Sequence, residues 1–151
     1  MIKRIFLLEI ALLFVVTAHA NLHQPNVIVI YTDDQGYGDV SALNLQSKFK
    51  TPNLDRLARE GIAFTHGHSS DSVCTPSRYG LLTGRYAWRT KLKKGVFEAE
   101  NKCLIPDDRM TLATLFQNKG YHTAMVGKWH LGMDFPGKPD KRDWSMPVVD
   151  M

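Results

Sequence analysis

The stretch SVCTPSRYGLLTGR, residues 72–85, places a cysteine directly before a Thr-Pro pair, with an arginine four residues later. Thr75 suits a helix cap and Pro76 suits the first helical position, so the sequence predicts a helix that begins beside Cys74. The positive end of a helix dipole favours a reactive thiolate or a bound anion. Arg78 lies one helical turn after Cys74, and we expect the two side chains on the same side of the helix.

Structural roles would also account for these two residues. A free cysteine commonly fills a core as a small apolar side chain. An exported protein with two cysteines could instead pair Cys74 with Cys103. Arg78 could form a surface salt bridge to Asp71. A disulfide leaves the Cys-x-Pro-Ser-Arg spacing unexplained, so other parts of the chain must decide between these roles.

Asp33 and Asp34 are adjacent and follow a β-branched apolar run at 26–32. Two neighbouring carboxylates repel each other unless positive charge lies between them, and a hard divalent cation with oxygen ligands supplies that charge. A turn in which one aspartate caps backbone amides is the alternative. The pair alone leaves both interpretations open.

Lys128 and His130 flank Trp129 just after the apolar stretch 121–126. In extended backbone alternate side chains share one side, so we expect the ammonium and the imidazole to point the same way. A divalent cation, these two groups and Arg78 around one nucleophile would suit a tetrahedral oxyanion with several charged oxygens. Sulfate and phosphate both fit that description.

The elements that must position these residues alternate between strands and helices. Capping and stop residues predict helices at 51–61 and 111–120. Apolar runs predict strands at 26–32, 62–65 and 121–126. This order favours an α/β fold with a largely parallel sheet. Ligands bind beyond the carboxyl ends of such strands, which is where all the candidate segments are expected to gather.

Residues 1–20 have the features of a secretory signal peptide, with two basic residues, an apolar run and the ending Ala-His-Ala. The apolar run is shorter than a membrane helix requires and Glu9 interrupts it, so we expect no stable membrane anchor. We therefore expect export, to the periplasm or out of the cell. Residues 21–151 then form one domain or part of one.

The charge balance points to no particular class of partner. The chain has 19 Lys and Arg against 15 Asp and Glu, a net charge of +4. The basic cluster at 91–94 lacks interleaved aromatic residues, so a solvated surface is favoured and no nucleic acid is expected as a partner.

Four segments together resemble the sulfatase family. CTPSR at 74–78, followed by LTGR at 82–85, is similar to the sulfatase signature, and further blocks follow the family's order: YTDDQGYGD, TPNLD and GKWHLG. The resemblance covers about residues 26–134. It implies an alkaline-phosphatase-like sulfatase fold, with a largely parallel sheet between helices. It also implies that residues 21–151 are the N-terminal, incomplete part of a sulfatase catalytic domain.

The resemblance implies that Cys74 is converted during export into formylglycine by a maturation enzyme. The hydrated aldehyde would supply the nucleophilic oxygen, and its second hydroxyl would allow sulfate to be eliminated afterwards. Asp33 and Asp34 match the family's first ligands for Ca²⁺, with Mg²⁺ as the alternative, and the residue made from Cys74 would join them at the metal.

The remaining matched residues are implied to bind the reacting groups. Arg78 would hold the formylglycine and offset charge at the metal, while Lys128 and His130 would contact the formylglycine hydroxyls and the sulfate. The implied activity is hydrolysis of the sulfate ester of a small molecule or a carbohydrate. Two other classes stay open: a phosphonate or phosphate ester hydrolase of the same fold, and a non-catalytic fragment in which Cys74 remains a thiol.

Overall fold

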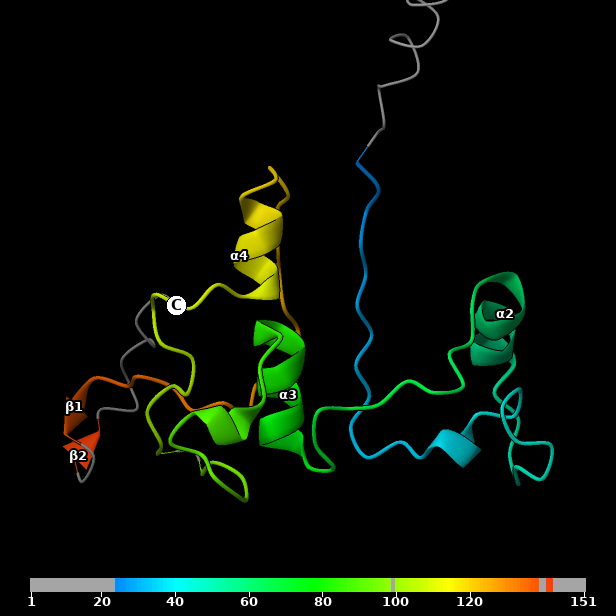
Figure 1. Ribbon diagram of the computed structural model, residues 1–151, viewed down its shortest axis with the longest axis horizontal. Helices are drawn as coiled ribbons and strands as arrows, with labels where there is room; N and C mark the ends of the chain where they lie inside the picture. Colours follow the sequence, from blue (N-terminus) through cyan, green and yellow to red (C-terminus); the bar gives the residue numbers. More distant parts are fainter. Residues whose placement is uncertain (1–23, 99, 139–140, 143–151) are drawn as a thin grey trace, which may run out of the picture. The chain divides into compact units, whose positions relative to one another are not determined.

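The computed structural model of the chain describes residues 24–98, 100–138 and 141–142. The predicted signal peptide, residues 1–20, lies outside them. The chain divides into two compact units, residues 1–31 and 32–151, and every candidate site residue belongs to the second. The described helices and strands are, in chain order, η1 (Tyr37–Asp39), α2 (Pro52–Glu60), α3 (Cys74–Thr83), η2 (Ala87–Arg89), α4 (Leu112–Gln117), β1 (Gly137–Lys138) and β2 (Lys141–Arg142). Figure 1 labels the α-helices and the strands. Within the described residues, no helix is long and apolar enough to cross a membrane.

α2 confirms the helix predicted after Thr51. Pro52 begins it and Gly61 follows its last residue, with the Gly61 amide donating to the Leu57 carbonyl at 2.9 Å. Thr51 does not cap the helix amides with its side chain. Its hydroxyl donates to a carboxylate oxygen of Asp55 at 2.8 Å, which ties the helix start to its own first turn.

α4 confirms the second predicted helix but is shorter than 111–120. The Thr111 hydroxyl caps it by accepting the Thr114 amide at 3.1 Å. The helix ends at Gln117, and a turn carries the chain to Gly120, whose φ of 82° is the left-handed conformation that glycine adopts readily.

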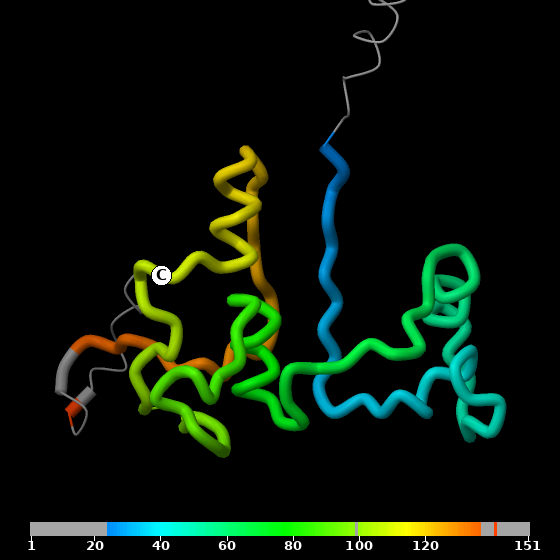
Figure 2. Tube along the Cα trace, viewed as in Figure 1, coloured from blue at the N-terminus to red at the C-terminus, as the bar shows by residue number. Residues whose placement is uncertain are grey.

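The predicted strands at 26–32, 62–65 and 121–126 are not paired into a sheet among the described residues. Figure 2 shows the first of these segments, coloured blue, as an extended trace. Its apolar side chains are exposed, as Ile28 is 84% and Ile30 is 74% accessible. The only strand pair described is the antiparallel two-residue ladder of β1 and β2. A strand forms only where a neighbouring backbone supplies its hydrogen bonds, so an apolar run alone does not produce one.

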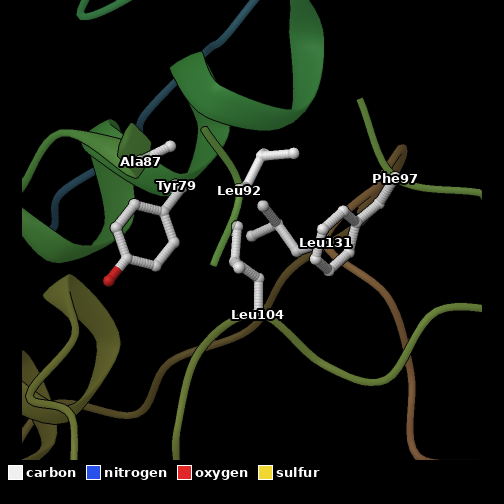
Figure 3. Close-up of a cluster of buried hydrophobic side chains, with 6 residues drawn as sticks. All are labelled: Tyr79, Ala87, Leu92, Phe97, Leu104 and Leu131. Carbon is white, nitrogen blue, oxygen red and sulfur yellow. The ribbon is translucent and has the colours of Figure 1, made fainter. Parts of the chain in front are cut away.

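The core of the second unit lies beside α3. Figure 3 shows its six buried apolar side chains, Tyr79, Ala87, Leu92, Phe97, Leu104 and Leu131. A backbone hydrogen bond of 2.8 Å from the Leu104 amide to the Leu131 carbonyl joins two of the loops that supply them. Leu131 is fully buried, so the core fixes the segment that also carries the candidate residues Lys128 and His130.

Candidate active site

A helix begins beside Cys74, as the sequence predicted, but α3 starts at Cys74 itself, so both its first residue and its cap differ from the expectation. Val73 is the N-cap residue and contributes no side-chain cap, and Thr75 is the second residue of the helix. The prediction that Thr75 caps this helix is therefore wrong. Its hydroxyl points away from the helix amides and bonds to two other loops.

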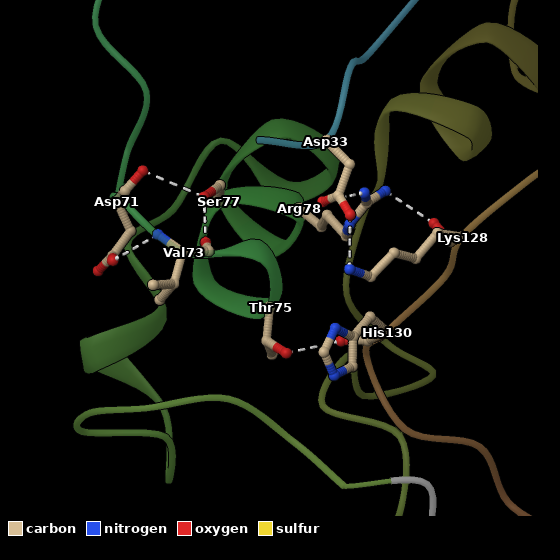
Figure 4. Close-up of polar contacts among 8 residues, drawn as sticks. All are labelled: Asp33, Asp71, Val73, Thr75, Ser77, Arg78, Lys128 and His130. Carbon is tan, nitrogen blue, oxygen red and sulfur yellow. Dashed lines mark hydrogen bonds and ion pairs between the residues drawn. The ribbon is translucent and has the colours of Figure 1, made fainter. Parts of the chain in front are cut away.

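Polar contacts just before α3 fix the chain that leads into Cys74. A carboxylate oxygen of Asp71 accepts the Ser72 amide at 2.7 Å and the Val73 amide at 3.3 Å. The Ser77 hydroxyl, one turn into the helix, contacts the backbone carbonyls of Val73 and Asp71. Figure 4 shows the contacts among Asp71, Val73 and Ser77 at the start of the helix. Asp71 therefore organises the helix start and is not a salt-bridge partner of Arg78.

Arg78, Asp33 and Lys128 form an ionic triad that joins three distant parts of the second unit (Figure 4). The Arg78 guanidinium donates to one Asp33 oxygen at 3.0 Å and the Lys128 ammonium donates to the other at 2.7 Å. A second Arg78 nitrogen donates to the Lys128 carbonyl at 2.7 Å. The Arg78 side chain is only 11% exposed, whereas those of Asp33 and Lys128 are 40% and 44% exposed.

The triad shifts the pKa values of its members. The hydrogen bond from Lys128, and after it that from Arg78, lowers the pKa of the Asp33 carboxyl group. The same contact with Asp33 raises the pKa of Lys128, and negative charge on Cys74 adds to that effect. Lys128 is therefore close enough to Cys74 for their charges to interact.

His130 is held by its ring and by its backbone. Its Nε2 atom lies 2.8 Å from the Phe97 carbonyl oxygen. A carbonyl oxygen only accepts, so Nε2 carries a hydrogen and donates it. The Nδ1 atom is buried and has no hydrogen-bond partner among the described residues. The backbone of His130 has a φ of 57°, which is uncommon outside glycine.

The structure brings three of the six residues that the sequence singled out into direct contact. Asp33, Arg78 and Lys128 are in direct contact, as their predicted convergence requires. Both cysteines are free thiols, so a disulfide between Cys74 and Cys103 is absent. Burial raises the pKa of the Cys103 thiol, which makes that cysteine a poor nucleophile.

The predicted metal ligands are not assembled into a complete site. Among the described residues, no group of three His, Cys, Asp or Glu side chains is placed to hold a metal. Both carboxylate oxygens of Asp33 are bound by cationic side chains. Asp34 has a φ of 57°, which turns the chain immediately after Asp33. Two carboxylates suit a hard cation but supply only part of the roughly six to eight oxygens that Ca²⁺ takes.

Sequence reasoning missed two groups that hold this site. The sequence predicts a helix cap for the Thr75 hydroxyl and gives no indication of the Phe97 backbone contact. A backbone carbonyl leaves no signal in residue type, so the Phe97 contact with His130 could not be predicted. For the Thr75 hydroxyl, the only indication in the sequence is that Thr75 directly follows Cys74.

Comparison with known proteins identifies the family of the chain. The sulfatase family model matches residues 25–143. An N-acetylgalactosamine-6-O-sulfatase of Bacteroides thetaiotaomicron is 41% identical over 120 residues, which are 80% of this chain and 23% of that protein. Bovine arylsulfatase A is 46% identical over 109 residues, 72% of this chain and 21% of that protein. The chain thus spans about a fifth of the length of these relatives.

A solved structure, from work on the metabolism of multiple glycosaminoglycans by Bacteroides thetaiotaomicron, is also similar. It matches with a TM-score of 0.70 and 41% identity, over 76% of this chain and 23% of that chain. This likeness confirms the expected fold class, the alkaline-phosphatase-like α/β fold of sulfatases, of which the described residues form a part without its parallel strand pairing. The family match covers well over half of the chain, and the chain belongs to the sulfatase family.

Proposed function

We propose that the complete protein carrying this chain hydrolyses sulfate esters with a formylglycine made from Cys74. The observation that carries the proposal is the convergence of Arg78, Lys128 and Asp33 beside the first residue of α3. Two cations next to a nucleophile at a helix N-terminus favour an anionic substrate with several charged oxygens. The sulfatase relatives supply the choice of sulfate over phosphate.

Each side chain has a role that follows from its position. The buried Arg78 guanidinium has a fixed orientation because it is held by Asp33 and by the Lys128 carbonyl, so it can offset negative charge without reorganising. The Lys128 ammonium is more exposed and can bind a sulfate oxygen or a formylglycine hydroxyl. His130 offers its unpartnered Nδ1 atom as the group that accepts or returns a proton.

The proposal includes a divalent cation, Ca²⁺ or alternatively Mg²⁺, with Asp33 and Asp34 among its ligands. A bound cation supplies positive charge to the nucleophile and to the sulfate oxygens. The described residues provide only part of its coordination shell. Binding would require Asp33 to turn at least one oxygen from its present cationic partner toward the metal.

Sulfated small molecules and sulfated carbohydrates are the proposed substrates. The similarity to an N-acetylgalactosamine-6-O-sulfatase supports the second group. We also propose that residues 1–20 direct export to the periplasm or the medium, without a stable membrane anchor, and that a formylglycine-generating enzyme modifies Cys74 on the way. No nucleic acid partner is proposed.

The test compares the complete protein with Cys74→Ala, Cys74→Ser and the matched control Cys103→Ala. We expect a mass spectrum of the wild-type peptide to show the aldehyde at position 74, with turnover of a generic aryl sulfate. Both changes at Cys74 should abolish turnover, while Cys103→Ala retains it, because Cys103 is a thiol outside the site. Equal turnover in Cys74→Ala and wild type would overturn the proposal. Faster hydrolysis of an aryl phosphonate ester would assign the protein to the alternative reaction.

A further inference from the structure

Thr75 makes contacts that neither a helix cap nor simple core packing explains. It is fully buried, and its hydroxyl donates to the His130 carbonyl at 2.9 Å while accepting the Phe97 amide at 3.1 Å. Both uses of the hydroxyl are therefore satisfied by the backbone of other loops. Figure 4 shows the Thr75 side chain facing His130 from the first turn of α3.

These contacts close a ring of hydrogen bonds around His130. The Phe97 peptide takes part twice, because its amide donates to Thr75 and its carbonyl accepts from Nε2 of His130. The Thr75 hydroxyl completes the ring at the His130 carbonyl. The backbone and the imidazole of His130 are thus fixed by the same two residues.

His130 needs such support because its φ of 57° is unfavourable for a residue with a side chain. Backbone in this region persists where surrounding contacts over-determine it. The fully buried Leu131 and its backbone bond to Leu104 fix the next residue. Thr75 fixes His130 itself, from the residue directly after Cys74.

We propose that Thr75 is a positioning residue, which holds His130 as the Nε2–H tautomer and so leaves Nδ1 without a hydrogen and able to accept one. The inference rests on the proposed function for the role of His130, but the geometry of the ring stands apart from it. Removing the hydroxyl leaves two buried backbone groups unsatisfied and releases the loop that carries the imidazole.

The experiment uses the complete protein with three substitutions. Thr75→Val removes the hydroxyl at nearly constant shape, and Thr75→Ser keeps it. Thr83→Val is the matched control, because the Thr83 hydroxyl bonds to the Tyr79 carbonyl within the same helix, away from His130. Turnover of an aryl sulfate is divided by the fraction of Cys74 converted, measured by mass spectrometry. Histidine tautomers are read from long-range ¹H–¹⁵N spectra of ¹⁵N-histidine-labelled protein, and His130 is assigned from the signal lost in His130→Asn.

We expect Thr75→Val to lower kcat by roughly tenfold or more with KM changed less than about threefold, since a misplaced imidazole weakens the transition state more than binding. Its His130 signal should show mixed tautomers. Thr75→Ser and Thr83→Val should remain within about twofold of wild type in kcat and keep the single Nε2–H tautomer. A kcat for Thr75→Val within twofold of wild type, or an unchanged His130 tautomer in that variant, would overturn the inference. A wild-type protein without sulfatase activity overturns the proposed function instead, and the spectra then test the ring alone.

Discussion

Asp33 is an aspartate whose charge is matched by two cations from different parts of the chain. Arg78 and Lys128 each bind one of its oxygens, and both lower the pKa of its carboxyl group below the ordinary 3.8. The three side chains differ in exposure, and the least exposed, Arg78, is the one that solvent screens least. Asp33 therefore serves as the counter-charge that joins the two cations.

The first prediction concerns Asp33→Asn in the metal-free protein. Because the folded-state pKa of Asp33 is lowered, its stabilisation is present above the ordinary value of 3.8 and disappears as the pH falls through the lowered value. Lys128 has a raised pKa, so its contribution is present below 10.5 and disappears as the pH rises through the raised value. We expect Asp33→Asn to lower the melting temperature across neutral pH.

The pH series that checks this extends into acid, where the two proteins should converge. Melting curves in a chelator, with Asp34→Asn as the neighbouring control, keep metal binding out of the comparison. Added salt should shrink the difference, because Asp33 and Lys128 are partly exposed. A difference that persists unchanged below the Asp33 pKa would show that the triad does not stabilise the fold by charge.

A second prediction tests which ring nitrogen of His130 takes part in proton transfer. The amide of His130→Asn lies near the position of Nδ1, and that of His130→Gln reaches the position of Nε2. Since Nε2 is engaged by the Phe97 carbonyl, we expect both variants to lose roughly 10²-fold in kcat and Asn to retain clearly more than Gln. Steady-state kinetics at equal formylglycine content measures this, and higher activity in Gln would assign the reaction to Nε2.

The sequence could identify most charged residues of this site because they carry their chemistry in their type. Asp33, Arg78 and Lys128 were each selected from spacing and family resemblance, and they meet in the structure. The Thr75 and Phe97 contacts could not be selected in the same way. They are made to backbone atoms, whose positions depend on how the loops pack and not on which residues the loops contain.

At the scale of elements, helices were predictable because their signals are local. Thr51, Pro52 and Gly61 mark α2 within eleven residues of sequence, and Thr111 caps α4 as expected. Strands need a partner that can lie far away in the chain, so apolar runs alone predicted strands that are not paired among the described residues.

The loop after His130 contains a glycine whose backbone conformation can be tested by substitution. Gly132 has a φ of 78°, and a Cβ atom there would overlap the backbone of Asn101 and Lys102. Gly95 has nearly the same φ, 79°, with open space around it. We expect Gly132→Ala to destabilise the fold by about 2–4 kcal/mol and Gly95→Ala by about 1 kcal/mol.

Denaturant unfolding of both alanine variants separates two causes. Strain from a positive φ acts in each of them, whereas steric overlap acts at Gly132 alone. Equal losses of stability would mean that the close approach between Gly132 and the loop 101–102 is relieved at no cost.

At the scale of the whole molecule, much apolar surface is left uncovered. Large side chains that are at least three-quarters exposed, or nearly so, occur in each segment predicted as a strand: Ile28, Ile30, Ile62, Phe64 and Val126. Among the residues that the structure describes, the buried core contains six apolar side chains. Such a balance gives little hydrophobic stabilisation for a chain of 151 residues.

We therefore predict that a polypeptide of these 151 residues alone folds poorly and has negligible sulfatase activity, even with Cys74 converted. It should bind 8-anilinonaphthalene-1-sulfonate and unfold over a broad range of temperature, as expected for exposed apolar surface. The complete protein is the control. A sharp calorimetric transition, together with aryl sulfate turnover within tenfold of the complete protein, would contradict this prediction.

The side-chain contacts of Asp33 also determine how the site opens locally. Asp33 bonds through its side chain to residues 45 and 95 positions away, whereas Leu104 and Leu131 are joined through their backbones inside the core. Opening of the ionic triad need not disturb that core. The triad and the core can therefore fluctuate independently. In native-state hydrogen exchange, the Leu104 amide should exchange only on unfolding of the core, while amides next to Asp33 exchange through frequent local opening. The contacts of Asp33 are then the part of the site that rearranges most readily.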